Sequence, residues 1–475
     1  MKLWAGRNYD YRFMFLAAFI IFAALHIWRL SASPNGYHKW RESDTAAVIQ
    51  NYYQEDMSFH QPRVLQRGAQ SGITGMELPI YNYSAAVLYK IFGSHHILPH
   101  LLTLLAALLS IWLFYRITTF FAGHATGVMA CWALAFSPLF FFYSYKIMPD
   151  IWMLTLLLGA VYAYILYLSK GPLIAWLLSA LLLCLSAGIK PLGLSVYLPL
   201  LYLTITSTGE RPKKLAVFAV YICLTLLTVL GWLAYARHLQ EAYGLSVFYL
   251  GGHGLKNFHR YLFDIVFIKK LFLQWPWELW IGWALTPAFL IGIYRYIKSP
   301  LSKFFPVWII AAYIVFALTA LKSSTHDYYT MIIVPPLAAV TGSGLYYLIL
   351  SAGWRKIVAV ILIAVAPIGA FIRIYDRFDD TTRFDRIREA ADIYIPAESL
   401  VMVQDNTPVV RLYQLNRKGW PLRGEITFAE TKKCVEQGAE YLILEKELKN
   451  YNDSLMLIFS DSAITLGGLY CYTLK

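Results

Sequence analysis

Long apolar runs constrain this chain more than any other feature. A helix needs about 20 apolar residues to cross the hydrocarbon core of a bilayer. Runs near this length recur from the N-terminal region to residue 374, and 58% of all residues are hydrophobic. We therefore predict an α-helical polytopic membrane protein with about 11 transmembrane helices, near residues 13–30, 97–116, 126–145, 150–168, 173–189, 191–206, 215–236, 277–297, 304–321, 329–350 and 356–374.

Lys and Arg indicate the orientation, because they gather in the cytoplasmic loops of membrane proteins. With the N-terminus in the cytoplasm, they fall in every cytoplasmic connection, as at Arg116, Lys170, Arg211, Arg295 and Arg355. We predict a multi-pass protein of the cytoplasmic (inner) membrane whose C-terminal domain is extracytoplasmic. The net charge of +13 then reflects topology. We expect membrane lipids as partners, and no nucleic acid.

Two segments lie outside the helical bundle. The first outer loop, residues 31–96, is longer than a connection requires, and long ordered loops are usually functional. We expect it to carry interfacial helices on a transmembrane domain of residues 1–374. Residues 375–475 are charged and contain no spanning run, so we predict a small C-terminal α/β soluble domain. Its expected elements are helices near 383–392 and 430–437, strands near 399–403 and 441–444, and a closing strand or hairpin near 463–472.

Three acidic residues lie at the ends of hydrophobic segments: Asp44, Glu77 and Asp150. Ser43 fits a helix N-cap, which would place Asp44 in the first turn of a helix lying in the membrane interface. Each acid alone is explained by a helix start, where a carboxylate is favoured. The predicted topology, however, brings all three to the outer face. Since a bare buried carboxylate costs several kcal/mol, we predict a reaction centre there, with Asp44 as general base.

Basic residues on the same face suggest a phosphate site. Lys190 and Lys322 lie at membrane level on the outer side, where topology does not require cations. Snorkelling alone would explain either one. Arg63 and Arg67 in the long loop offer further bidentate contacts to phosphate.

A metal site is a further possibility. His326 lies beside an acid, and such a pair either exchanges hydrogen bonds or binds metal. A divalent metal ion at His326 and Glu77 therefore stays open, and no other cofactor is indicated.

At these residues the chain resembles the C-type glycosyltransferase superfamily, in particular its bacterial protein O-mannosyltransferase and lipid A aminoarabinose transferase branch. The motifs that carry the resemblance are Arg41-Glu42-Ser43-Asp44, Met76-Glu77-Leu78-Pro79, Pro149-Asp150, Lys190-Pro191 and His326-Asp327-Tyr328-Tyr329. The sequence departs from the commonest pattern at Thr45 and at Leu78.

The resemblance implies transfer of a sugar from a polyprenyl-phosphate carrier to a lipid, glycan or protein acceptor at the outer membrane face. It makes Asp44, Glu77 and Asp150 the expected catalytic acids, and Lys190 and His326 contacts to phosphate or metal. Inversion at the anomeric carbon is expected when one carboxylate acts as base without a covalent intermediate.

Two other functions stay open. A ligase or polymerase would transfer a whole lipid-linked glycan. A flippase or transporter of lipid-linked sugars would carry its charges near the middle of the membrane, within repeated and broken segments.

Overall fold

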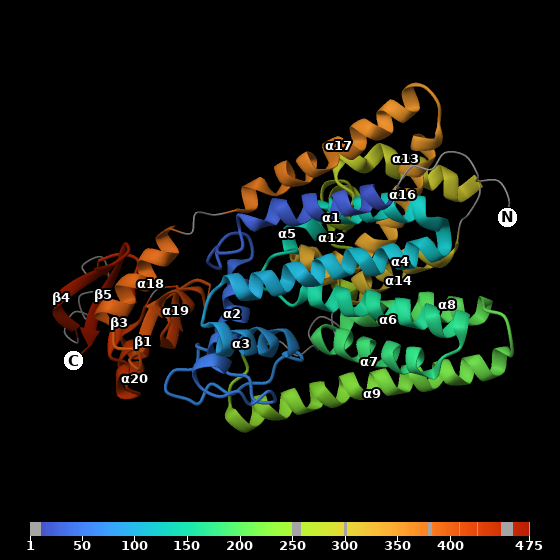
Figure 1. The fold of residues 1–475 in the computed structure, drawn as a ribbon. Helices are drawn as coiled ribbons and strands as arrows, with labels where there is room; N and C mark the ends of the chain where they lie inside the picture. The colour runs from blue at the N-terminus through green and yellow to red at the C-terminus, as the bar shows by residue number, and fades with distance from the viewer. Residues whose placement is uncertain are drawn as a thin grey trace.

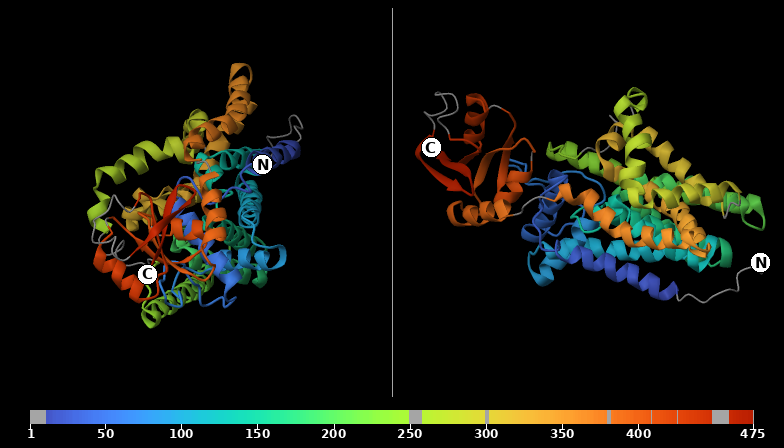
Figure 2. Two further views of the ribbon diagram at one scale, coloured as in Figure 1. Left: turned by 90° about the vertical axis from the view of Figure 1, so that its left-hand side faces the viewer. Right: turned by 90° about the horizontal axis from the view of Figure 1, so that it is seen from above.

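A computed structural model describes residues 11–248, 258–298, 302–378, 382–407, 409–424, 426–447 and 459–474. A bundle of long helices occupies one end of the molecule and a small sheet with its helices occupies the other (Figure 1). The helices of the first outer loop lie between these two parts. The beginning of α1 lies at the end of the bundle that is farthest from the sheet, as a second view also shows (Figure 2).

The helices of the bundle follow the apolar runs of the sequence. The longer ones are α1 (Tyr11–Ile27), α4 (Ile97–Ala135), α6 (Asp150–Lys170), α7 (Leu173–Ile189), α8 (Tyr197–Thr206), α9 (Arg211–Tyr243), α13 (Thr286–Lys298), α14 (Phe304–Leu318), α16 (Val334–Leu350) and α17 (Trp354–Ile374).

Short helices join the long ones: α5 (Pro138–Tyr143), η1 (Pro191–Val196), α11 (Phe258–Leu262), α12 (Ile265–Ile268), η2 (Lys269–Gln274), η3 (Pro276–Trp280), η4 (Trp283–Leu285), α15 (Ala320–Thr325), η5 (Asp327–Ile333) and η6 (Tyr375–Arg377).

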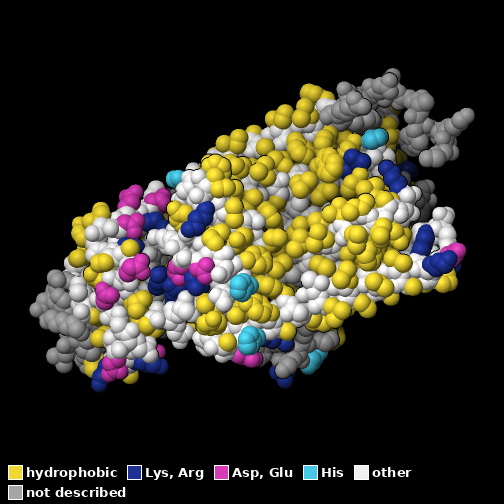
Figure 3. Space-filling model, turned by 60° about the horizontal axis from the view of Figure 1, so that its bottom comes forward, with side chains coloured by type: hydrophobic (Ala, Val, Ile, Leu, Met, Phe, Trp, Pro, Cys, Tyr) yellow, Lys and Arg dark blue, Asp and Glu magenta, His cyan; other side chains and the backbone are white. Residues whose placement is uncertain are grey.

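The surface of the bundle identifies a multi-pass membrane protein. Among the described residues, 5 helical segments are long and apolar enough to cross a bilayer, and four shorter apolar helices accompany them. Hydrophobic side chains cover the bundle in a broad band (Figure 3). Charged side chains of both signs gather at the sheet end, whereas mostly Lys and Arg appear at the opposite end. The expected polytopic helical class is confirmed, while the number of spans stays a prediction.

Helix α4 is two helices joined at Gly123. This residue has φ 80° and ψ 166°, which is not helical. Beyond it the chain turns back, so that the Cys131 thiol donates to the carbonyl oxygen of Ile111 at 3.3 Å. Residues twenty positions apart in one straight helix would be about 30 Å apart. The reversal therefore produces the two separate segments expected near 97–116 and 126–145.

The C-terminal segment forms the expected α/β unit. Its sheet has the order β2-β1-β3-β5-β4, with β1 parallel to β2 and β3, and β5 antiparallel to both of its neighbours. Its elements are α18 (Thr382–Tyr394), β1 (Leu400–Gln404), α19 (Val410–Leu415), β2 (Lys418–Leu422), α20 (Phe428–Glu436), β3 (Tyr441–Leu444), β4 (Phe459–Leu466) and β5 (Leu469–Leu474). Strand β2 was not predicted, because its Gly, Trp and Pro do not show the alternation of a strand.

The expected start of the helix in the first outer loop was wrong. Helix α2 (Lys39–Gln54) is capped by His38, which has φ 61°, and not by Ser43. Asp44 therefore lies beyond the first turn, and Ser43 is buried.

Helix α2 does not present an apolar face to its surroundings. It is buried from Arg41 to Tyr52, and its Val48 and Ile49 share a hydrophobic core with Leu412 and Tyr413 of α19. Helix α3 (Ile80–Phe92) leaves Ile91 and Phe92 more than half exposed, so it fits the expected interfacial helix better.

Gly123 offers a test of the helical reversal. Its backbone conformation is almost exclusive to glycine and costs other residues about 1–3 kcal/mol. We expect Gly123→Ala to lower the thermal stability of the purified protein. Gly231 in α9 is the matched control, because a Cβ at either position meets nothing within 4 Å. Gly231→Ala should be neutral or stabilising, since alanine favours a helix interior. Equal stability of the two variants would contradict the reversal.

Candidate active site

Arg41 joins two of the three predicted acids. Its guanidinium is 3.4 Å from the Asp44 carboxylate, which lies one turn further along α2. It also forms an ion pair with Glu77, in the loop just before α3. The side chains of Arg41 and Asp44 are 10% and 8% exposed, so this pairing compensates charge where water cannot.

The third acid forms a second, adjoining pair. Asp150 is the first residue of α6 and is completely buried. Its carboxylate accepts a hydrogen bond of 2.5 Å from the ammonium of Lys190, which lies between α7 and η1. The rings of Tyr328 and Tyr329 in η5 lie 4.4 and 5.0 Å from the same ammonium. A desolvated cation over aromatic faces gains further stabilisation.

The two pairs belong to one electrostatic cluster. The positive charges of Arg41 and Lys322 both lower the pKa of Lys190, and the charge of Arg41 also lowers the pKa of Lys322. We call Arg41, Asp44, Glu77, Asp150, Lys190 and Lys322 the acid–cation cluster. The structure thus brings together all three predicted acids and both predicted lysines.

Two buried acceptors of this cluster have no hydrogen-bond donor within the described part of the chain. Among the described residues, none donates a hydrogen bond to Oδ1 of Asp44 or to Oδ2 of Asp150. Buried polar atoms are normally satisfied, and a catalytic role is one of the reasons for an exception. The two free oxygens are therefore positioned to accept a hydrogen bond or a proton from a bound molecule.

Burial tunes the titration of both pairs. Burial raises the pKa of Asp44 to about 6, although the charge of Arg41 opposes this shift. For Lys190, burial lowers the pKa to about 8, against the opposing effect of Asp150. Arg41 and Lys322 lower it further as like charges. Near neutral pH, Asp44 is then mostly ionised and Lys190 mostly protonated, close to the range that acid–base catalysis favours.

Arg63 and Arg67 take other partners. The Arg67 guanidinium donates to Glu55 at 2.6 Å, and that of Arg63 lies 3.7 Å from Glu55 and 3.5 Å from Asp56. These contacts hold the first outer loop together. The structure gives no support to a role for these two arginines in phosphate binding.

His326 does not lie in a metal site of recognisable composition. Its ring lies 5.5 Å from that of His38, 5.6 Å from that of Trp40 and 5.4 Å from that of Tyr328. Within the described ranges, no group of three or more His, Cys, Asp or Glu side chains is arranged to hold a metal ion. Glu77 is paired with Arg41 instead. The residues present do not fit the divalent metal considered for His326 and Glu77.

Sequence reasoning overlooked three members of the site. Arg41, Tyr328 and Tyr329 stand inside the motifs that predicted it but received no role there. A cation three residues before a buried acid on one helix is a signal for pairing. Adjacent tyrosines at the mouth of an apolar segment are equally typical of an interface belt, so their contact with Lys190 required the structure.

Comparison with known proteins agrees with the motifs. Residues 77–235 match the family model described as dolichyl-phosphate-mannose-protein mannosyltransferase. No curated protein matches the chain in sequence.

Solved structures show the fold. ArnT from Cupriavidus metallidurans bound to undecaprenyl phosphate has a TM-score of 0.64 at 11% identity, over 98% of each chain. The oligosaccharyltransferase of Archaeoglobus fulgidus has a TM-score of 0.60 at 13% identity, over 92% of this chain and 70% of that one. The mycobacterial arabinofuranosyltransferase AftD has a TM-score of 0.57 at 14% identity, over 99% of this chain and 42% of that one.

The chain is similar to the glycosyltransferases of this family over residues 77–235 and shares the fold of the solved transferases. The family match and the shared fold confirm the resemblance that the motifs indicated. Within this fold, the acid–cation cluster joins α2 and the loop before α3 to the start of α6, to the residue between α7 and η1, and to α15.

Proposed function

We propose that this glycosyltransferase moves a sugar from a polyprenyl-phosphate carrier to an acceptor at the outer face of the cytoplasmic membrane, with inversion. The observation that carries the proposal is the acid–cation cluster, in which a buried carboxylate with a free oxygen adjoins buried cations. Such a transfer needs a base for the incoming nucleophile and positive charge for the departing phosphate.

Asp44 serves as the general base. The hydroxyl or amine of the acceptor attacks the anomeric carbon while Oδ1 of Asp44 takes its proton. The bond between that carbon and the phosphate oxygen breaks, and the electron pair leaves with the phosphate. Because no covalent intermediate with the enzyme forms, the anomeric configuration inverts.

Cations receive the departing phosphate. Lys190 is held by Asp150 and by two tyrosine rings, and Lys322 adds positive charge nearby. Lys190 can turn from Asp150 to the phosphate, since Lys is a flexible point charge with three donors. Arg41 remains with Asp44 and Glu77 and keeps Asp44 ionised.

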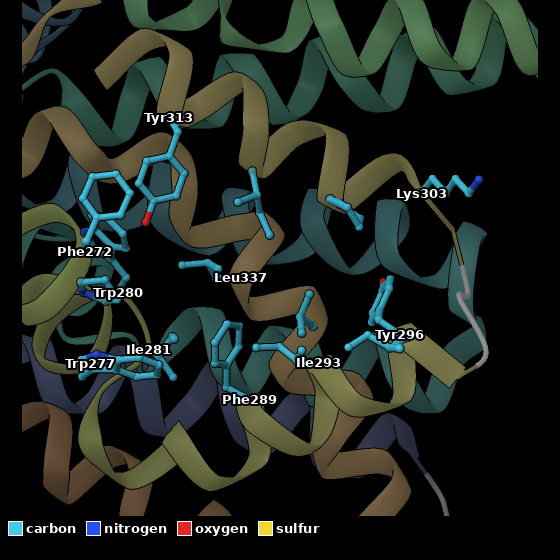
Figure 4. A pocket seen from close by; sticks show the side chains of 15 residues that line it. Phe272, Trp277, Trp280, Ile281, Phe289, Ile293, Tyr296, Lys303, Tyr313 and Leu337 are labelled. Carbon is cyan, nitrogen blue, oxygen red and sulfur yellow. The ribbon is translucent and has the colours of Figure 1, made fainter. Parts of the chain in front are cut away.

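An apolar cavity offers space for the isoprenoid tail. It measures about 590 Å³ and lies among α13, α14, α16 and η3. Phe272, Trp280 and Tyr313 line one end and Tyr296 and Lys303 the other (Figure 4). Trp280 also donates to Thr330 of η5, the helix that presents the two tyrosines to Lys190. A structure of ArnT contains undecaprenyl phosphate, a ligand with such a tail.

The site lies at the outer end of the bundle in the predicted topology, with the N-terminus cytoplasmic and the C-terminal domain extracytoplasmic. The segregation of Lys and Arg at the other end of the bundle supports this orientation. The acceptor is a lipid, a glycan or a protein. Transfer of a whole glycan uses the same cluster, and similarity to an oligosaccharyltransferase keeps that variant open.

The pKa values predict a bell-shaped pH profile. Asp44 should govern the acid limb. The value of kcat/KM should fall as pH drops through about 6, because this base becomes protonated there. Lys190 should govern the alkaline limb, with a fall as pH rises through about 8. The groups that face Lys190 are Asp150, Arg41, Lys322, Tyr328 and Tyr329.

Two variants of Lys190 distinguish the effect of its positive charge from the effect of its deprotonation. Lys190→Arg retains a cation that does not titrate below pH 12, so the alkaline limb should disappear up to about pH 10. Lys190→Met should raise the donor KM or lower turnover. An alkaline limb that is unchanged in Lys190→Arg would show that another group produces it.

Asp44→Asn tests the general base. The substitution keeps the shape of the side chain and removes its ability to take a proton. As general base, Asp44 should contribute on the order of 10²–10⁴-fold in rate. We expect the variant to fold, to bind polyprenyl phosphate and to lose turnover to this extent.

Asp56→Asn is the matched control. Asp56 lies on the same loop, and its carboxylate is 43% exposed and contacts Arg63 at 3.5 Å. This variant should retain wild-type turnover. If Asp44→Asn retains more than about a tenth of the wild-type rate, the base is another acid of the cluster.

A further inference from the structure

A second buried cluster lies beside the acid–cation cluster and contains Asp327. This residue begins η5 and is 1% exposed. Its Oδ1 accepts a hydrogen bond of 2.5 Å from the Tyr143 hydroxyl and lies 3.3 Å from Nε2 of His38. Its Oδ2 accepts from the Arg377 guanidinium at 2.8 Å. None of these four residues belongs to the acid–cation cluster.

The four residues come from four different parts of the chain. His38 caps α2, which carries Arg41 and Asp44. Tyr143 ends α5, and Asp327 opens η5. Arg377 ends η6, at the junction between α17 and the first helix of the C-terminal domain. The Asp327 carboxylate therefore connects three parts of the structure. These are the helix that carries the proposed base, the helix that carries the two tyrosines, and the domain junction.

Two aromatic rings, a carboxylate and a backbone hydrogen bond hold Arg377 in place. Its guanidinium stacks 4.4 Å from the ring of Tyr37 and 5.2 Å from that of Phe142. Its carbonyl oxygen accepts a hydrogen bond of 3.1 Å from the backbone of Tyr37. A planar guanidinium held by stacking and by a carboxylate is a geometry that Lys does not reproduce.

A continuous path of contacts leads from this cluster to the phosphate-binding cation. The ring of His38 lies 5.1 Å from the ring of Tyr328. Tyr328 in turn lies 4.4 Å from the ammonium of Lys190. His38 holds this place in a left-handed conformation, with φ 61°, which costs a residue other than glycine free energy and persists where the surroundings impose it.

We propose that Asp327 and Arg377 are positioning residues that fix His38 and Tyr328 around Lys190, and so place this cation for the donor phosphate. The inference rests on the proposed function, because it assigns Lys190 to the phosphate. It predicts that a substitution at the domain junction weakens phosphate binding although the substituted residue does not contact the ligand. Mutations along such packed networks typically change coupling by two- to thirtyfold, or about 0.5–2 kcal/mol.

Arg377→Lys and Tyr143→Phe test the inference in the full-length purified protein. The first keeps the charge and removes the planar geometry, and the second removes one hydrogen bond to Asp327. The probe is polyprenyl phosphate, whose dissociation constant is measured by intrinsic tryptophan fluorescence in detergent. We expect both variants to weaken binding by about two- to thirtyfold. The donor KM should rise by a similar factor, with kcat at saturating donor unchanged within about twofold.

Arg373→Lys is the matched control. Arg373 lies one turn earlier on α17 and pairs with Glu278 at 2.8 Å, outside the path to Lys190. This variant should bind polyprenyl phosphate as the wild type does. Tyr143→Phe keeps the test decisive if Arg377→Lys fails to fold.

The outcomes separate this inference from the proposed function. Wild-type affinity in Arg377→Lys and Tyr143→Phe, whatever their thermal stability, would overturn the positioning role and leave the proposed function intact. A wild-type protein that does not bind polyprenyl phosphate would overturn both.

Discussion

Compensation of buried charge in the acid–cation cluster is the constraint on which the rest of this structure depends. Bare ions in a dry interior cost several kcal/mol each, and an attractive partner must offset that cost. Arg41 lies between two carboxylates, and Lys190 lies between a carboxylate and two aromatic rings. The members of the cluster come from α2, the loop before α3, α6, the residue between α7 and η1, and α15, so the fold and the site share one set of interactions.

The compensation of buried charge is incomplete, and this suits acid–base catalysis. One oxygen of Asp44 and one of Asp150 accept no hydrogen bond from the described protein groups. Full pairing would hold Asp44 at a low pKa and make it a weak base, whereas burial with a single cation nearby raises its pKa to about 6. The same balance lowers the pKa of Lys190 to about 8. The buried cluster thus exchanges some stability for groups that titrate near the working pH.

Much of the bundle was predictable from the sequence, because membrane-spanning helices require apolar runs that few other structures produce. The predicted segments near 150–168, 173–189 and 356–374 correspond to α6, α7 and α17. The start of α2 was mispredicted, because Ser43 matches the preferred cap in local sequence. Tertiary contacts decided otherwise: His38 is held by Asp327, and α2 is buried between the bundle and the sheet domain. The missed strand β2 likewise forms because β1 offers it a partner.

The site was predictable in part, for a similar physical reason. Topology alone delivers Asp44, Glu77, Asp150, Lys190 and Lys322 to one face. It does not say which cation meets which acid, and Arg63 and Arg67 lie in the same loop yet contact Glu55. Nor does topology reveal that Asp327, next to the candidate ligand His326, accepts hydrogen bonds from Arg377 and Tyr143. Pairing among long-range partners depends on packing, which no local pattern contains.

The most direct measurement incubates the purified protein with a panel of polyprenyl-phosphate sugars and membrane extract as acceptor, and follows release of polyprenyl phosphate. The account predicts release from at least one donor, in proportion to the sugar transferred. No release from any of these donors, together with turnover of a glycan linked through polyprenyl pyrophosphate, would contradict it.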